Sequence, residues 1–134
     1  MRLFAALLLS LFCLAFSCQR RTLTNTRWKV LELRLANSSN TLYPTKTYIV
    51  EFRDSTSIGI KLDINTCGGG YKLSKDNTIE ISPLACTKAC CDSELAQNIA
   101  MTLSEMTVVK GSSKKLVLEN PTKRSTIKLE LVEK

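Results

Sequence analysis

IGIKLDINTCGGGY, the stretch from Ile58 to Tyr71, decides the fold of this chain. Its first half places a large aliphatic residue at every second position as far as Ile64, with small or polar residues between them. A period of two puts one face of a β-strand in a core and the other in water. A glycine turn at 68–70 follows, and Tyr71 starts another strand. These two strands must be antiparallel, because a parallel crossover needs a longer connection.

Similar alternation on both sides of this stretch predicts a mainly β domain. Upstream, strands are expected over 26–35, with Leu31, Leu33 and Leu35 facing the core, and over 48–53. Polar turn residues separate the strands that follow. Those downstream strands are expected at 71–73, 78–81, 106–110, 116–119 and 126–132.

One helix interrupts the predicted strands. It starts near Asp92-Ser93-Glu94, whose acidic and hydroxyl groups suit the unpaired N–H groups and positive end of a helix. An apolar stripe at helical spacing follows and should pack on the sheet. The stripe consists of Leu95, Ile99, Leu103 and Met106. The fold class predicted from these patterns is α+β, mainly β and barrel-like, with one packed helix.

The N-terminus has the parts of a secretory signal peptide. Arg2 supplies a positive charge, residues 3–16 are apolar apart from Ser10, and a small residue precedes Cys18. The apolar run is shorter than the roughly 20 residues that a membrane-spanning helix needs. We therefore expect export and cleavage rather than permanent insertion.

The segment LAFSC at 14–18 resembles the bacterial lipobox, in which the cysteine after the cleavage point is acylated. The resemblance implies a lipoprotein signal peptide at 1–17, a palmitate-bearing Cys18 with a lipid-anchored tether over 18–25, and a domain over 26–134. Gln19 resembles the signal for delivery to the outer membrane, so the domain is expected to face the periplasm. The alternative is an ordinary cleaved signal peptide with an incidental cysteine.

The chain carries a net charge of +7 and no histidine. Its basic residues are scattered and interleave with few aromatic ones, which favours a solvated basic surface over a nucleic-acid site. Such a surface would also suit anionic lipid headgroups. Without histidine a Ser-His-Asp triad is impossible and the commonest metal ligand is missing. We expect no catalytic residues, no metal, no cofactor and no nucleic-acid partner.

The four cysteines of the domain predict disulfides, because an even number in an exported chain favours pairing. A bond between the neighbours Cys90 and Cys91 would be strained. Cys67 is therefore expected to pair with Cys90 or Cys91, and Cys86 with the other. A four-thiolate zinc site is the less favoured alternative, because one arm supplies a single cysteine and the other supplies three crowded together.

Gly68-Gly69-Gly70 could approach a phosphate, but no Gly-Lys-Ser/Thr follows it. We expect these glycines to supply positive φ and room beside a disulfide.

Three segments in order resemble the META domain family, also called HslJ-like, of small bacterial envelope proteins. They are LTNTRW at 23–28, NTCGGGY at 65–71 and CTKACCDSE at 86–94. The resemblance implies a compact, partly open antiparallel β-barrel with a helix across it, often on a lipoprotein. It also implies a role loosely linked to envelope stress or secretion, and no known reaction.

The leading functional hypothesis is a non-enzymatic envelope lipoprotein that binds or assists another component. Its expected partners are the membrane, through the lipid, and an unidentified envelope protein or hydrophobic ligand. A second hypothesis is that the barrel interior holds an acyl chain or hydrophobic peptide, as the resembling folds of some secretion pilotins suggest, although these side chains also suit plain core packing. The residues expected to line that interior are Trp28, Tyr48, Phe52, Ile60 and Leu62. A third is a thiol-disulfide redox protein that uses the cluster of Cys86, Cys90 and Cys91.

Overall fold

The computed structural model describes residues 21–133, so the predictions for the signal peptide and for Cys18 lie outside the described residues. Within that range the chain forms nine strands and one helix. The elements are β1 (Thr26–Arg34), β2 (Ile49–Phe52), β3 (Ser57–Lys61), β4 (Thr66–Leu73), β5 (Ile79–Ile81), β6 (Ala85–Cys86), α2 (Glu94–Ser104), β7 (Val108–Gly111), β8 (Lys115–Asn120) and β9 (Ser125–Glu133).

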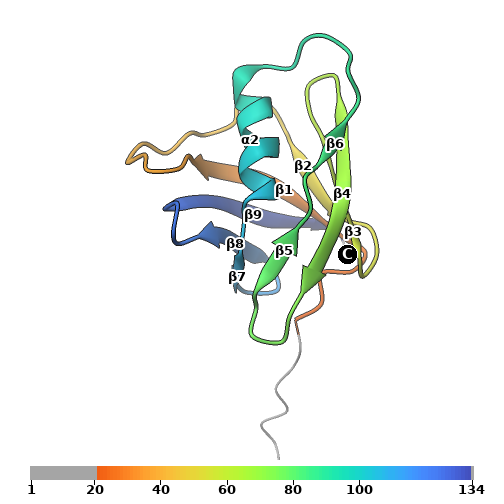
Figure 1. Ribbon diagram of the computed structural model, residues 1–134, viewed down its shortest axis with the longest axis vertical. Helices are drawn as coiled ribbons and strands as arrows, with labels where there is room; N and C mark the ends of the chain where they lie inside the picture. The colour runs from red at the N-terminus through yellow and green to blue at the C-terminus, as the bar shows by residue number, and fades with distance from the viewer. Residues whose placement is uncertain (1–20, 134) are drawn as a thin grey trace, which may run out of the picture.

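The strands form one antiparallel sheet that curls into a nearly closed barrel (Figure 1). Their order is β5-β4-β3-β2-β1-β9-β8-β7, and the short β6 pairs with β4 on the edge opposite β3, which β5 also uses. A bridge between Thr78 and Val108 brings the two ends of this order together. Two backbone hydrogen bonds flank it, from Ile79 N to Thr107 O and from Val109 N to Asn77 O, both 2.9 Å long. The predicted mainly β, antiparallel barrel with one helix is therefore confirmed.

The alternating stretch that predicts the fold forms β3, and its large side chains lie in the core. Ile58 and Ile60 are fully buried, and Leu62 directly after the strand is 6% exposed. Burying such a side chain contributes roughly 1.5–3 kcal/mol, so this one face is a large part of the stability. Ile64 is 45% exposed, because β3 ends at Lys61 and the chain turns while the alternating sequence pattern still continues.

A β-bulge in β1 changes which residues face the core. The register with β9 shifts between Val30 and Glu32, and an extra residue in one strand reverses the alternation that follows it. Trp28 and Val30 are buried before the shift and Leu33 after it, whereas Leu31 is half-buried. The predicted face of leucines is therefore right for Leu33, which is fully buried, and for Leu35, which packs against the core, but not for Leu31.

The glycine run lies inside β4 and is not a turn. Gly68, Gly69 and Gly70 pair with the residues of β3, and positive φ among the glycines of residues 21–133 occurs only at Gly111. The prediction of positive φ is therefore wrong. Gly69 does leave room, because a Cβ atom there would lie 2.9 Å from the Ser82 Oγ, but its neighbour is this side chain and not the predicted disulfide.

The helix forms where the sequence predicts it. Ser93 is the N-cap and its hydroxyl accepts a hydrogen bond of 3.3 Å from Ala96 N. Ile99 and Leu103 are fully buried, and α2 packs against the barrel in contact with β9 (Figure 1). Across residues 21–133, no helix has the length and apolar character needed to cross a membrane.

Candidate functional site

The disulfides differ from the prediction. The pairing of β6 with β4 sets Cys86 directly opposite Cys67, with 4.0 Å between their Cα atoms, and these two cysteines are bonded. The expectation that Cys67 pairs with Cys90 or Cys91 is therefore wrong, because strand register brings Cys86 to it instead. Cys90 and Cys91 are bonded to each other. Both are exposed in the loop before α2, at the top of Figure 1.

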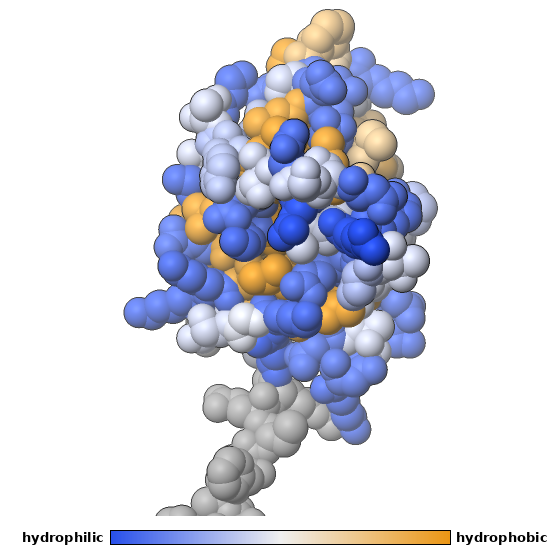
Figure 2. All heavy atoms as spheres, turned by 90° about the vertical axis from the view of Figure 1, so that its left-hand side faces the viewer, coloured by the Kyte–Doolittle hydropathy of each residue, from blue (hydrophilic) through white to orange (hydrophobic). Residues whose placement is uncertain are grey.

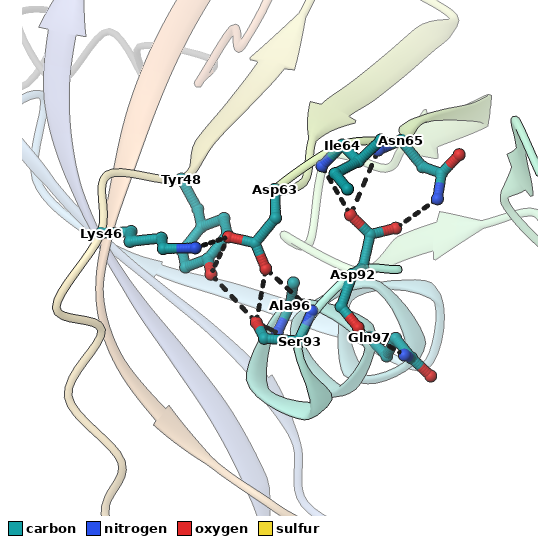
Figure 3. A network of polar contacts seen from close by, with 9 residues as sticks. All are labelled: Lys46, Tyr48, Asp63, Ile64, Asn65, Asp92, Ser93, Ala96 and Gln97. Carbon is teal, nitrogen blue, oxygen red and sulfur yellow. Dashed lines mark hydrogen bonds and ion pairs between the residues drawn. The ribbon is translucent and has the colours of Figure 1, made fainter. Parts of the chain in front are cut away.

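A polar clamp made by Asp63, Asn65, Asp92 and Ser93 joins the β3–β4 turn to the start of α2 (Figure 3). The Asp63 side chain is 8% exposed and sits in its centre. Its carboxylate accepts hydrogen bonds from the Ser93 backbone N–H at 2.9 Å and hydroxyl at 2.5 Å, and from the Tyr48 hydroxyl at 3.0 Å. The Lys46 ammonium lies 2.9 Å away. The Ser93 hydroxyl, and after it Lys46, hold the pKa of Asp63 well below its usual range.

Asp92 and Asn65 form the second half of the clamp. Asp92 accepts hydrogen bonds from Ile64 N at 2.8 Å, Asn65 N at 3.1 Å and Asn65 Nδ2 at 2.6 Å. The Ile64 N–H contributes most to lowering the pKa of the Asp92 carboxyl. The buried Asn65 amide also donates to Ala89 O and accepts from Ala89 N and the Thr87 hydroxyl. Both N–H donors and both lone pairs of this side-chain amide are therefore used.

The clamp explains two of the sequence segments that resemble the META domain. Asn65 begins the middle segment, and Thr87, Ala89, Asp92 and Ser93 belong to the segment before the helix. Because the donors and acceptors of its central groups are engaged with one another, the clamp is suited to hold the fold together.

Acid should weaken the clamp. The fold lowers the pKa of Asp63 and of Asp92. It also lowers the pKa of Asp54 to about 2, chiefly through the hydrogen bond from the Thr56 N–H. A carboxyl whose pKa is lower in the folded than in the unfolded protein stabilises the fold fully above its unfolded pKa of about 3.9. That stabilisation is lost as the pH falls through the pKa of the folded state. We expect a melting temperature that changes little above about pH 5 and drops between about pH 4 and 2. Thermal melts at constant ionic strength measure it. Asp63→Asn should flatten the drop, and a melting temperature that rises on acidification would contradict the assignment.

A pocket of about 600 Å³, the end pocket, lies where the chain leads into β1 and where β7 turns into β8. Figure 1 shows these two segments at the lower end of the barrel, away from the β3–β4 turn. Its lining combines apolar side chains with hydroxyls and two cations. The lining residues are Arg21, Thr22, Leu23, Thr26, Trp28, Ser112, Ser113, Lys114, Leu116 and Leu131.

Two local structures shape the pocket. The Trp28 indole N–H donates to the Thr26 hydroxyl at 2.7 Å, and that hydroxyl donates to the Leu23 carbonyl, which fixes the turn into β1. On the other wall Gly111 has a φ of +109°, and a Cβ there would lie 2.2 Å from the Lys115 carbonyl oxygen. Only glycine allows this β7–β8 turn, and the Gly111 carbonyl accepts a hydrogen bond from Arg21 Nη2.

The predicted apolar lining is only partly at this pocket. Trp28 lines it, whereas Tyr48, Phe52, Ile60 and Leu62 pack in the core of the barrel, all at most 6% exposed. The edge-to-face contact of Phe52 with Tyr71, 5.0 Å between ring centres, is part of that packing. Sequence patterns missed the pocket because its other residues come from the lead-in to β1 and from strand ends. The polar run 112–114 between two strands is the one sequence feature that points to the pocket.

Apolar side chains elsewhere on the surface are scattered. Among the described residues the large exposed ones are Tyr43, Ile64, Met101 and Val132, which belong to a loop, a turn, α2 and β9. Figure 2 shows one face on which hydrophilic residues predominate and hydrophobic ones form small separate patches. Single exposed apolar residues are normal on soluble domains, so the pocket is the better candidate for binding.

Comparisons with known proteins agree with the fold. The family profile described as META domain matches residues 21–133. No curated protein matches the chain. A DUF4847 family protein from Bacteroides vulgatus has a similar structure, with a TM-score of 0.62, 15% identity, and coverage of 84% of this chain and 96% of that one. A protein from Burkholderia xenovorans has a TM-score of 0.64, 16% identity, and coverage of 84% and 85%. At such identities the two structures show the fold alone. Because the family profile spans the whole described range, this chain belongs to the META domain family.

Proposed function

We propose that this META domain protein is exported, anchored by a lipid on Cys18 to the outer membrane with its domain in the periplasm, and acts without catalysis by binding a hydrophobic ligand or partner. Its accessory role would then lie in envelope stress or secretion. The observation that supports binding most directly is the end pocket, whose apolar lining residues are Leu23, Trp28, Leu116 and Leu131.

The place of the pocket fits a lipid-anchored protein. Arg21 lines the pocket and follows Cys18 by three residues, a stretch that spans at most about 10 Å when extended. A lipid on Cys18 would therefore keep the pocket close to the membrane surface. A ligand that partitions into the membrane would reach the pocket without crossing bulk water.

Native mass spectrometry of the protein extracted from membranes tests the binding role. Leu131→Arg places a charge on the pocket wall, whereas Val132→Arg changes the neighbouring residue, whose side chain is 54% exposed. We expect a reproducible co-purifying lipid or peptide on the wild type and on Val132→Arg, and its loss on Leu131→Arg. A wild type that repeatedly carries no such mass would contradict the proposal.

The exposed Cys90–Cys91 pair favours a second candidate, a thiol-disulfide redox function. Cys86 takes no part in it, because Cys86 is bonded to Cys67. In an insulin-reduction assay with dithiothreitol as the reductant, turnover by the wild type that is lost in Cys90→Ala would support this function. A Cys90–Cys91 bond that mass mapping finds intact after the same treatment would eliminate it.

A further inference from the structure

Arg21 lines the end pocket, and one nitrogen of its guanidinium has no hydrogen-bond partner among residues 21–133. Its Nη2 donates to the Gly111 carbonyl, but its Nη1 is buried and has no hydrogen-bond partner among residues 21–133. A guanidinium stays protonated in proteins, and a buried donor without a partner is costly. An anionic oxygen beside the guanidinium would satisfy this nitrogen with a charge-assisted hydrogen bond once the side chain turns to expose it.

The other polar groups of the pocket also suit an anion. Lys114 is the second cation in the lining, and none of the described lining residues is acidic. The Ser112 oxygen accepts hydrogen bonds from Lys114 N at 3.3 Å and Lys115 N at 3.2 Å, so its own O–H can donate to a ligand. A concave site lined by one sign of charge attracts the opposite charge.

The apolar residues of the pocket lining suit a hydrocarbon chain. Trp28 and Leu116 are almost fully buried and Leu131 is half-buried, and all three belong to the rigid barrel strands β1, β8 and β9. The volume of about 600 Å³ lies within the range of small-molecule sites. A lining that combines two cations with apolar side chains matches a molecule with one anionic head and one apolar chain.

We propose that the end pocket binds a single-chain anionic amphiphile, whose carboxylate or phosphate head contacts Arg21 and Lys114 and whose chain lies on Trp28, Leu116 and Leu131. This inference rests on the proposed binding role and adds the chemical class of the ligand. Two sources offer the same chemistry, a free fatty acid and a phosphate-headed lysolipid.

Trp28 fluorescence gives a direct readout, because it is the only tryptophan of the chain and lines the pocket. The protein purified from membranes is reconstituted in phosphatidylcholine nanodiscs and titrated with decanoate, decyl phosphate or uncharged decanol. We expect a saturable change with both anions and weaker binding of decanol. Tighter binding of decyl phosphate than of decanoate would point to the lysolipid as the source, and the reverse order to the fatty acid.

Three variants separate the head contact from folding. Arg21→Gln should weaken binding of decanoate by about tenfold and that of decanol by less than about twofold. Lys114→Gln, on an exposed side chain, should weaken decanoate binding in the same direction, and Lys115→Gln on the same turn but outside the lining should leave it unchanged. Equal losses for decanol and decanoate in Arg21→Gln would overturn the inference and leave the hydrophobic binding role intact. A wild type with no saturable response to any probe would count against both.

Discussion

Replacing Asn65 by alanine is expected to lower the free energy of unfolding by about 3 kcal/mol. The Asn65 residue is 6% exposed, and its amide nitrogen donates to Ala89 O and to Asp92 Oδ2, both at 2.6 Å. Its amide oxygen accepts from the Thr87 hydroxyl at 2.7 Å and from Ala89 N at 2.8 Å. Alanine would leave these donors and acceptors without a hydrogen-bond partner in a half-buried site. Polar groups that are removed from water and left unpaired make a broken polar network costly. Urea unfolding followed by Trp28 fluorescence measures the loss.

The matched control is Asn98→Ala. Asn98 is half-buried on α2 and its side chain makes no hydrogen bond within the described residues, so the same chemical change should alter the free energy of unfolding by no more than about 0.5 kcal/mol. Equal losses at the two positions would show that the clamp at Asn65 contributes nothing beyond an ordinary asparagine.

Removing the Cys67–Cys86 disulfide, as the double variant Cys67→Ala/Cys86→Ala, is expected to cost a similar amount. The bond joins residues 19 apart, and closing a loop of that length stabilises a fold by about 3 kcal/mol in the chain-entropy model. It also ties the two-residue strand β6 to β4, next to the glycine run. Because Cys67 is fully buried, alanine rather than serine avoids placing a new hydroxyl in the core.

The second disulfide provides the control. Cys90→Ala/Cys91→Ala removes a bond between adjacent exposed residues, which closes almost no loop, so its loss should cost less than about 1 kcal/mol. Calorimetry of both double variants under oxidising conditions measures the difference. A larger loss for the Cys90/Cys91 variant than for the Cys67/Cys86 variant would contradict the pairing.

The elements that the sequence predicts well are those whose signal is local. The alternation through Ile58 and Ile60 and the stripe of Ile99 and Leu103 report burial on one face directly, since each residue's neighbours along the chain set its side. The bulge near Leu31 was not predicted, because an extra residue in a strand cannot be recognised in a sequence whose alternation continues unbroken.

The disulfides and the pocket depend on contacts between distant segments. Cys86 lies in a strand of two residues, too short to show any period, yet the pairing of that strand with β4 decides which cysteine meets Cys67. Arg21 and Ser112 are polar residues outside the strands, and only the closure of the barrel brings them to one pocket. Sequence patterns therefore predicted the barrel and the clamp's helix start, but neither the bonding partner of Cys67 nor the candidate binding site.

The central proposal is that Cys18 anchors this META domain to the membrane through a lipid. Labelling of growing cells with radioactive palmitate tests it most directly, with Cys13→Ala as the control for the other cysteine of the N-terminal segment. We predict label on the wild type and on Cys13→Ala, and none on Cys18→Ala. A Cys18→Ala protein that still takes up the label would contradict the account.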